Sequence, residues 1–280
     1  MQTLTTVAEL RANVRAWKHG GLRVGFVPTM GNLHAGHFSL IELAKRHADR
    51  VVASVFVNPT QFGPDEDFAR YPRTLDADAA GLVDHGCDVL FAPTVREMYP
   101  DGVGNAVQVR VPGITAILDG AHRPGHFDGV ATVVARLFNM VQPDAAVFGQ
   151  KDYQQLQVIR QLVRDLAFPI AIIAAPTSRA DDGLALSSRN QYLSPAERAL
   201  APEIHRTLVA MRDAVHGGQP LASVEAEATS RLADLGFAVD YAAILRNDLA
   251  TPVAGDRTGL VALVAARLGT TRLIDNLLLD

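Results

Sequence analysis

Two histidines in PTMGNLHAGHFSL, residues 28–40, have a spacing that suits phosphate chemistry. His34 and His37 are three residues apart, so a turn of helical geometry would place both rings on one side. Imidazoles can donate hydrogen bonds to phosphate oxygens whose charge grows in a transition state. Gly31 and Gly36 let the backbone turn tightly and approach a ligand closely. A strand-to-helix turn with incidental histidines explains these residues alone equally well. A metal site is less favoured, because no carboxylate or third histidine lies at ligand spacing nearby.

Lys151 is a second candidate for contact with an anion. It lies in AVFGQKDYQQ, after a predicted strand and where a helix begins. A lysine there is electrostatically misplaced, because the positive end of the helix dipole repels it. The only other lysines in the chain are Lys18 and Lys45. A bound anion such as a triphosphate explains this position better than a solvated helix start does.

Two side-chain amides follow the second predicted strand in FVNPTQFGPDEDFARYPR. Asn58 and Gln61 supply neutral donors and acceptors, which can orient a hydroxylated carboxylate without imposing charge. The alternative is that Asn58-Pro59 only forms a turn. The amides therefore indicate a small polar acid as a possible ligand.

Hydroxyl and guanidinium groups gather in DGLALSSRN, where Ser187 and Ser188 precede Arg189. Hydroxyls beside an arginine are a common way to bind phosphate, although an ordinary hydrogen-bonded linker remains possible. Arg123 and His126 in AHRPGHFDGV lie ahead of a predicted helix and are less specific alone.

The elements that must position these residues alternate between buried strands and amphipathic helices up to about residue 175. Strands are predicted at 22–27, 51–57, 87–92, 144–149 and 169–175, and helices near Gly36 and at 75–86, 128–141 and 153–166. Strands buried on both faces and joined by helices predict a doubly wound parallel sheet of the Rossmann-like α/β class. Ligands of such sheets collect at the carboxyl ends of the strands, where most of the candidates lie.

The pattern changes after Pro176. A polar stretch is followed by a helix at 194–215 with Ser194 at its cap, a helix at 221–236, and strands at 237–246 and 259–268. We therefore predict two domains, a Rossmann-like domain at 1–176 and a smaller α+β domain at 177–280.

Composition limits the function classes. The chain has 280 residues, is 48% hydrophobic and carries a net charge of −4, so it offers no basic field for nucleic acid. Its single cysteine, Cys87, lies in a buried-strand pattern and excludes an internal disulfide framework. The absence of a cationic-apolar leader and of a bilayer-spanning apolar run predicts a soluble, cytoplasmic protein.

Taken in order, PTMGNLHAGH, FVNPTQFGPDEDFARYPRT, RPGHFDGVATVV, FGQKDYQQ and DGLALSSRNQYLS resemble the pantoate–β-alanine ligase family. The first motif is similar to the HxGH motif of the nucleotidyltransferase superfamily. The resemblance extends from about Val24 to the helix after Tyr192. It implies ATP-dependent condensation of pantoate with β-alanine through pantoyl adenylate, with release of AMP and pyrophosphate.

The resemblance also assigns roles to residues. It implies that ATP is bound by Met30, Gly31, His34, His37, Gly149, Gln150, Lys151, Asp152, Ser178, Leu186, Ser187, Ser188 and Arg189. Catalysis is assigned to His37, His34 and Lys151. Pantoate is assigned to Gln61 and Gln155 with Asn58 nearby, and Arg123 and His126 match the RPGH segment as further substrate-binding residues.

Magnesium, dimerisation and domain closure are further implications of the resemblance. Some relatives place magnesium-associated acids where Asp76 and Asp78 lie, although Ala77 separates the two here. Asn32 replaces an alanine common in the ATP loop. Relatives are homodimers, so a homodimer is expected, and an ATP site built from both domains would close on binding.

Two other functions remain open at this point. A relative that stops at nucleotidyl transfer, such as a phosphopantetheine or nicotinamide mononucleotide adenylyltransferase, would keep the nucleotide in its product. A catalytically silent nucleotide-binding module would release no pyrophosphate. The amides of FVNPTQF and KDYQQ favour the ligase, because they suit a pantoate pocket.

Overall fold

The computed structural model of the chain describes residues 1–63, 68–253 and 255–280. The chain divides into two units. Unit 1 comprises Met1–Gln150 and Gln155–Pro176, and unit 2 comprises Lys151–Gln154 and Thr177–Asp280. Part of the FVNPTQFGPDEDFARYPR stretch, residues 64–67, lies outside the described residues.

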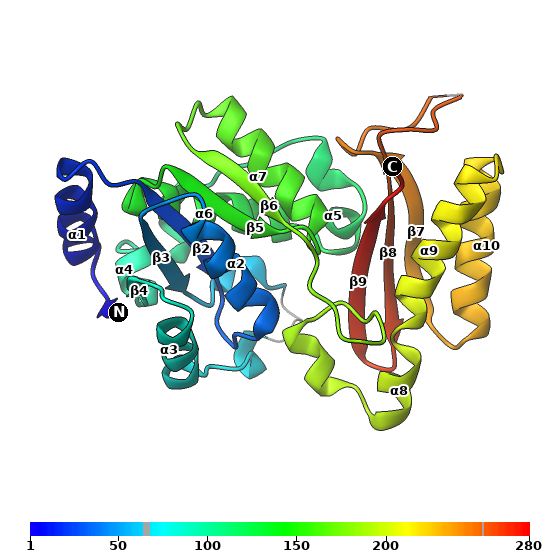
Figure 1. Cartoon of the computed structure of the whole chain (residues 1–280), viewed down its shortest axis with the longest axis horizontal. Helices are drawn as coiled ribbons and strands as arrows, with labels where there is room; N and C mark the ends of the chain where they lie inside the picture. Colours follow the sequence, from blue (N-terminus) through cyan, green and yellow to red (C-terminus); the bar gives the residue numbers. More distant parts are fainter. Residues whose placement is uncertain (64–67, 254) are drawn as a thin grey trace. The chain divides into compact units, whose positions relative to one another are not determined.

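Unit 1 is built on a parallel sheet, whose described strands run in the order β1-β4-β3-β2-β5-β6 (Figure 1). The strands are β1 (Gln2–Leu4), β2 (Val24–Thr29), β3 (Arg50–Val55), β4 (Val89–Phe91), β5 (Ala145–Gly149) and β6 (Ala171–Ala175). The helices of this part of the chain are α1 (Val7–His19), α2 (Ala35–Lys45), α3 (Leu75–Asp84), α4 (Val95–Met98), α5 (Asp119–His122), α6 (His126–Val141) and α7 (Tyr153–Asp165). The predicted doubly wound α/β class is confirmed.

The sheet is buried on both faces because successive residues of its apolar strands place their side chains on opposite faces in turn. Phe26 of β2 packs with residues of α1, α6 and α7 in one core, whereas the next residue, Val27, packs with α2 and α3 in a second core. Successive side chains of a strand point to opposite faces, so one continuous apolar run can serve two helical layers.

The strand order reverses direction between β2 and β5. The chain runs from β2 through β3 to β4 on one side, and β5 then pairs with β2 on its other side, with Gly25 opposite Ala145. Such a topological switch point opens a crevice at the carboxyl ends of the two strands. The loops that begin after Thr29 and after Gly149 leave the sheet there.

Unit 2 contains an antiparallel sheet in the order β7-β8-β9 with α9 and α10 packed side by side on it (Figure 1). Its elements are α8 (Pro195–Leu200), α9 (Glu203–His216), α10 (Leu221–Asp234), β7 (Ala238–Arg246), β8 (Leu260–Leu268) and β9 (Thr271–Leu278). Leu208 and Met211 of α9 and Val264 of β8 contribute to its core.

Four elements differ from those predicted. The N-terminal pair β1 and α1 and the last strand β9 were not expected from the sequence. The helix predicted at 194–215 is instead two helices, α8 and α9, which Ala201 and Pro202 separate. Proline has no N–H to donate within a helix and clashes with the preceding turn, so a new helix starts after Pro202.

Residues 151–154 belong to unit 2, although the sequence pattern predicted them in the first domain. Their backbone and side chains are tied to the C-terminal strands. Asn276 Nδ2 donates to the carbonyl oxygen of Lys151 at 2.9 Å, and Tyr153 OH donates to the carbonyl oxygen of Asn247 at 2.9 Å. None of the helices in the described ranges has the length and apolar character needed to cross a bilayer.

Candidate active site

The loop after β2 adopts a conformation that glycine favours and a buried carboxylate holds. Gly31 and Asn32 both have positive φ, at +85° and +53°. Asp78, which is 2% exposed on α3, accepts from the backbone N–H of Asn32 at 3.0 Å and from that of Leu33 at 2.8 Å. A Cβ at Gly31 would approach Asp78 Oδ2 to 3.0 Å, so this loop requires glycine next to its clamp.

His34 and His37 lie at the N-terminus of α2 with their ring centroids 4.2 Å apart. Nδ1 of His34 accepts from the N–H of Gly36 at 3.1 Å, and Nδ1 of His37 accepts from the N–H of His34 at 3.3 Å. A backbone N–H can only donate, so Nδ1 of each neutral ring is unprotonated and Nε2 carries the hydrogen. Each ring therefore carries its hydrogen on Nε2, at the positive end of a helix.

The start of this helix is closed by a side chain. The His34 ring caps the backbone N–H of Gly36. The first free amide of α2 is therefore satisfied within the loop by a side chain.

Asn58 and Gln61 form a buried amide pair in the 3₁₀ turn Pro59–Gln61 after β3. Asn58 is 0% exposed, and its Nδ2 donates to Gln61 Oε1 at 3.0 Å and to the carbonyl oxygen of Gly129 at 3.2 Å. Its Oδ1 accepts from Tyr99 OH at 2.8 Å. The Gly129 carbonyl can only accept, which fixes the orientation of the Asn58 amide. Gln61 therefore turns its oxygen toward Asn58, which leaves its NH₂ group on the other side of the amide.

His126 and Arg123 pack against the same turn. Nδ1 of His126 lies 2.8 Å from the carbonyl oxygen of Gln61, and Nε2 lies 3.0 Å from Arg123 NH1. The carbonyl accepts and the guanidinium donates, so His126 carries its hydrogen on Nδ1. The Arg123–His126–Gln61 chain brings a cation to the backbone of the amide pair.

Lys151 lies two residues before α7, in the turn that follows β5. Its side chain is 19% exposed, and Nζ is 3.9 Å from Asp152 Oδ2, which is a weak ion pair. Gln155, on the first turn of α7, is half-buried and belongs to unit 1. The lysine is therefore held mainly through its backbone.

A short hairpin in unit 2 carries the remaining candidates. Leu186 N–H donates to the carbonyl oxygen of Ser178 at 2.9 Å, and the chain reverses at Gly183, whose φ is +93°. Ser187 Oγ accepts from Arg189 N–H at 3.2 Å and caps the 3₁₀ turn Ser188–Tyr192. The hydroxyl of Ser187 is thus also a local structural group.

Asp76 and Asp78 do not converge on one point. Asp76 is exposed and Asp78 is buried, because residues two apart on a helix point in different directions. Both Asp78 oxygens already accept hydrogen bonds, including one from Thr74 Oγ1 at 3.1 Å. Over the described ranges, no group of three or more His, Cys, Asp and Glu side chains is arranged to hold a metal.

Two groups near the strands are kept neutral by burial. Burial raises the pKa of the Cys87 thiol to about 11, and its Sγ donates to the carbonyl oxygen of Val89 at 3.3 Å. Burial likewise raises the pKa of Tyr99, whose hydroxyl serves Asn58. Cys87 is a core residue, as the sequence indicated, and has no nucleophilic role.

Among the residues that hold the candidates in place, Tyr99 and Asn276 were not found from the sequence, and Asp78 was given a different role. Tyr99 supports Asn58, Asp78 clamps the loop at 31–33, and Asn276 holds Lys151. The only signal in the sequence for the last of these is the polar pair Asp275-Asn276 inside the apolar run TRLIDNLL. Nothing local marks Tyr99.

The fold and these residues define a class. Unit 1 is a doubly wound sheet with two histidine rings at the start of the helix after β2 and a buried amide pair after β3. This is the architecture of α/β enzymes that bind nucleotides. Residues 2–278 match the family model described as Pantoate-beta-alanine ligase. A pantothenate synthetase from Xylella fastidiosa (strain 9a5c) is 62% identical over 278 residues, which covers 99% of each chain.

Solved structures show the same similarity. Pantothenate synthetase from Thermus thermophilus is 52% identical, with a TM-score of 0.92 over 100% of this chain and 99% of that one. Pantoate-beta-alanine ligase from Francisella tularensis, complexed with beta-gamma ATP and beta-alanine, is 35% identical, with a TM-score of 0.83 over 100% and 98%. The chain belongs to the pantoate–β-alanine ligase family, and it is an enzyme that joins pantoate to β-alanine with ATP.

Proposed function

We propose that this ligase works in two steps and that the paired histidines of α2 serve the first. A pantoate carboxylate oxygen attacks the α-phosphorus of ATP, a P–O bond forms, and pyrophosphate leaves. The amine of β-alanine then attacks the carbonyl carbon of pantoyl adenylate, AMP leaves with that oxygen, and the amine gives up a proton. The observation that carries the proposal is the pair of Nε2–H donors on His34 and His37.

The first step needs charge stabilisation rather than a base. Pantoate's carboxylate is already a nucleophile, whereas negative charge grows on the α-phosphate and on the leaving pyrophosphate. His37 and His34 donate to these oxygens, and Lys151 supplies a full positive charge. No serine or cysteine nucleophile is required, in keeping with the buried Cys87.

The amide pair is assigned to pantoate. Gln61 turns its oxygen to Asn58, so the group that it can offer a ligand is its NH₂, which matches a hydroxyl or carboxylate oxygen and disfavours a ligand that can only donate. Asn58 is saturated within the protein, so we assign it the role of orienting Gln61 instead of touching substrate. Gln155 is the second pantoate residue, and Arg123 with His126 supports Gln61 through its carbonyl oxygen.

The remaining assignments concern ATP. The proposed ATP-binding residues are Met30, Gly31, His34, His37, Gly149, Gln150, Lys151, Asp152, Ser178, Leu186, Ser187, Ser188 and Arg189. Support comes from the loop after β2 and the end of β5, which flank the switch point where α/β sheets bind ligands.

Magnesium is assigned to the ATP complex that the enzyme takes up as substrate. The described residues do not fit a protein-held ion, because Asp76 and Asp78 diverge and both oxygens of Asp78 accept backbone N–H groups. We therefore assign no step to a resident metal.

The oligomeric state is assigned from the family resemblance, and the location follows the expectation from the sequence. We propose a homodimer in the cytoplasm. A sedimentation mass near twice the 30.0 kDa of one chain supports the dimer, and the mass of one chain contradicts it.

Oxygen tracing tests the two-step reaction. Pantoate labelled with ¹⁸O in its carboxylate should pass one ¹⁸O to AMP, and AMP should appear only when β-alanine is present. Pantoate and ATP without β-alanine should give pyrophosphate up to about one equivalent per site. Label in inorganic phosphate, or a product that retains the nucleotide, would contradict the proposal.

A further inference from the structure

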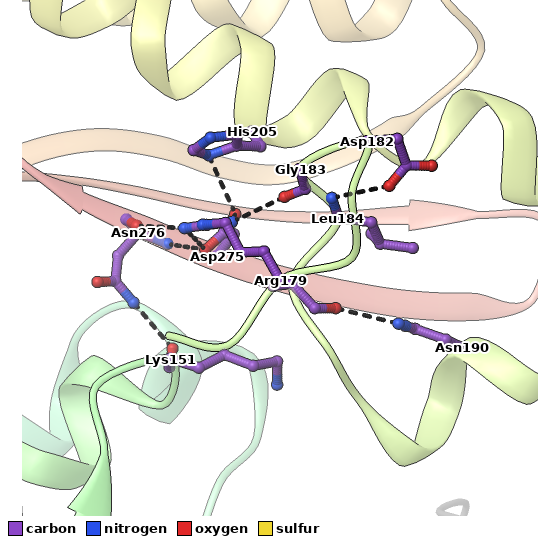
Figure 2. Close-up of polar contacts among 10 residues, drawn as sticks. Lys151, Arg179, Asp182, Gly183, Leu184, Asn190, His205, Asp275 and Asn276 are labelled. Carbon is purple, nitrogen blue, oxygen red and sulfur yellow. Dashed lines mark hydrogen bonds and ion pairs between the residues drawn. The ribbon is translucent and has the colours of Figure 1, made fainter. Parts of the chain in front are cut away.

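Strand β9 carries two adjacent polar residues that are almost fully buried. Asp275 is 5% and Asn276 is 3% exposed, in a strand whose other buried positions are apolar or threonine. Burying a carboxylate and an amide costs free energy unless each is hydrogen-bonded, so the partners of this pair matter. Figure 2 shows that the partners come from two separate segments of unit 2.

Asn276 is bonded to the candidate catalytic lysine. Its Nδ2 donates to the carbonyl oxygen of Lys151 at 2.9 Å, and its own N–H donates to Asp275 Oδ1 at 2.8 Å (Figure 2). The bond reaches the backbone of Lys151 and leaves its ammonium group available to a ligand. The ion pair between Lys151 Nζ and Asp152 Oδ2, at 3.9 Å, is too weak to hold the lysine in place by itself.

Asp275 is bonded to the hairpin at 178–186, which precedes the hydroxyl residues Ser187 and Ser188. Arg179 forms two bonds with its carboxylate, NH1 to Oδ2 at 2.5 Å and NH2 to Oδ1 at 2.9 Å. The same guanidinium donates to the carbonyl oxygens of Gly183 at 3.1 Å and of Asn276 at 3.4 Å. A bidentate pair has one geometry, so it fixes the hairpin at 178–186 against β9.

We propose that Asn276 is a positioning residue for Lys151, held in place by the Arg179–Asp275 pair. Asn276 holds the turn of Lys151, and the adjacent Asp275 holds the hairpin before Ser187. Both segments are therefore fixed to the same strand. Preorganised charge avoids reorganisation during the reaction, which is why a lysine that serves phosphate needs a fixed backbone. This inference rests on the proposed function, in which Lys151 acts in adenylation.

A double-mutant cycle tests the inference. Asn276→Ala, Lys151→Ala and the double variant are compared with the parent enzyme by the single-turnover rate of pyrophosphate release from ATP and pantoate. We expect Asn276→Ala alone to lower this rate by about 10- to 100-fold, because misplacement of about 1 Å can cost about 100-fold. In the Lys151→Ala background the same change should cost less than about twofold, since coupled residues are not additive.

The matched control is Ile244→Val in the core of the same sheet, where Ile244 is 2% exposed on β7. It perturbs unit 2 without touching Lys151 and should leave the rate within about twofold. If Asn276→Ala does not fold, Asn276→Asp keeps the side-chain shape, removes the donor and enters the same cycle.

The outcomes separate the inference from the proposed function. An equal loss from the Asn276 change in both backgrounds, or no loss at all, overturns the positioning role. A parent-like rate of pyrophosphate release in Lys151→Ala refutes the proposed role of Lys151, and the inference with it. Because this outcome is measured on the Lys151→Ala single variant, it is distinguishable from a failure of the Asn276 role alone. Loss confined to the background that retains Lys151 supports the inference.

Discussion

At the scale of single residues, the site depends on which atom carries each proton. His34 and His37 lie at a helix start whose backbone N–H groups occupy their Nδ1 atoms. This contact fixes the tautomer that donates from Nε2 without a carboxylate partner. Gln61 is oriented in the same way, because Asn58 takes its oxygen. The backbone and buried amides thus decide which atoms of these side chains are donors.

We predict that His37→Ala lowers the adenylation rate while the fold survives. Removal of one transition-state donor typically costs about 2.7–4 kcal/mol. Pyrophosphate release from ATP and pantoate in a single turnover measures the loss. His47→Ala, which removes an exposed histidine just after α2, is the matched control and should retain the parent rate. Near-parent turnover of His37→Ala would refute the role assigned to it.

The second prediction at this scale separates Asp78 from Asp76. Asp78→Asn turns an NH₂ group toward a backbone N–H of the loop at 31–33, so we expect a stability loss of about 1–3 kcal/mol and a higher KM for ATP. Asp76→Asn, two residues away and exposed on the same helix, should change neither. Urea unfolding and ATP titrations over a range of Mg²⁺ concentrations measure both. A similar shift in Mg²⁺ dependence in the two variants would show instead that the acids share a metal.

At the scale of elements, α9, β9 and the hairpin at 178–186 enclose one neutral imidazole. His205 of α9 lies with Nδ1 at 3.9 Å from Asp275 Oδ2, beside the Arg179 guanidinium. Desolvation by burial lowers the pKa of His205, and the charges of Arg179 and Arg212 lower it further, whereas Asp275 opposes them. A Cβ at Gly183 would approach the His205 ring to 2.7 Å, so the hairpin turn closes tightly over it.

We predict that this histidine makes unit 2 less stable in mild acid. Because its pKa is lower in the folded state than the value of about 6.5 expected when unfolded, the unfolded chain binds a proton first as the pH falls. Stability contributed by neutral His205 is therefore complete above about pH 6.5 and decreases below it. His205→Gln should reduce the fall in thermal midpoint between about pH 7.5 and about pH 5.5.

The control for this experiment is His19→Gln, which replaces an exposed histidine at the end of α1. It should leave the pH dependence of the midpoint as it is in the parent chain. Parallel curves for His205→Gln and the parent would exclude His205 as a source of acid sensitivity.

At the scale of the whole molecule, the sequence predicted the doubly wound class and most strands, because buried parallel strands read as continuous apolar runs. It did not predict β9, since Asp275 and Asn276 interrupt the apolar pattern of TRLIDNLL. It also assigned Lys151 to the first domain, because neighbours in sequence were taken as neighbours in space. The partner that draws Lys151 into unit 2 lies 125 residues away.

The amino-acid sequence alone determined the enzyme family of this protein, through histidines three apart after a strand, a rare lysine at a helix start and paired amides in the order typical of that family. The tertiary structure alone decided which groups hold others in place. Asn58 orients Gln61, and Asp78 clamps a loop instead of pairing with Asp76. The physical reason is that proton positions and buried hydrogen bonds depend on partners far along the chain, which local patterns do not encode.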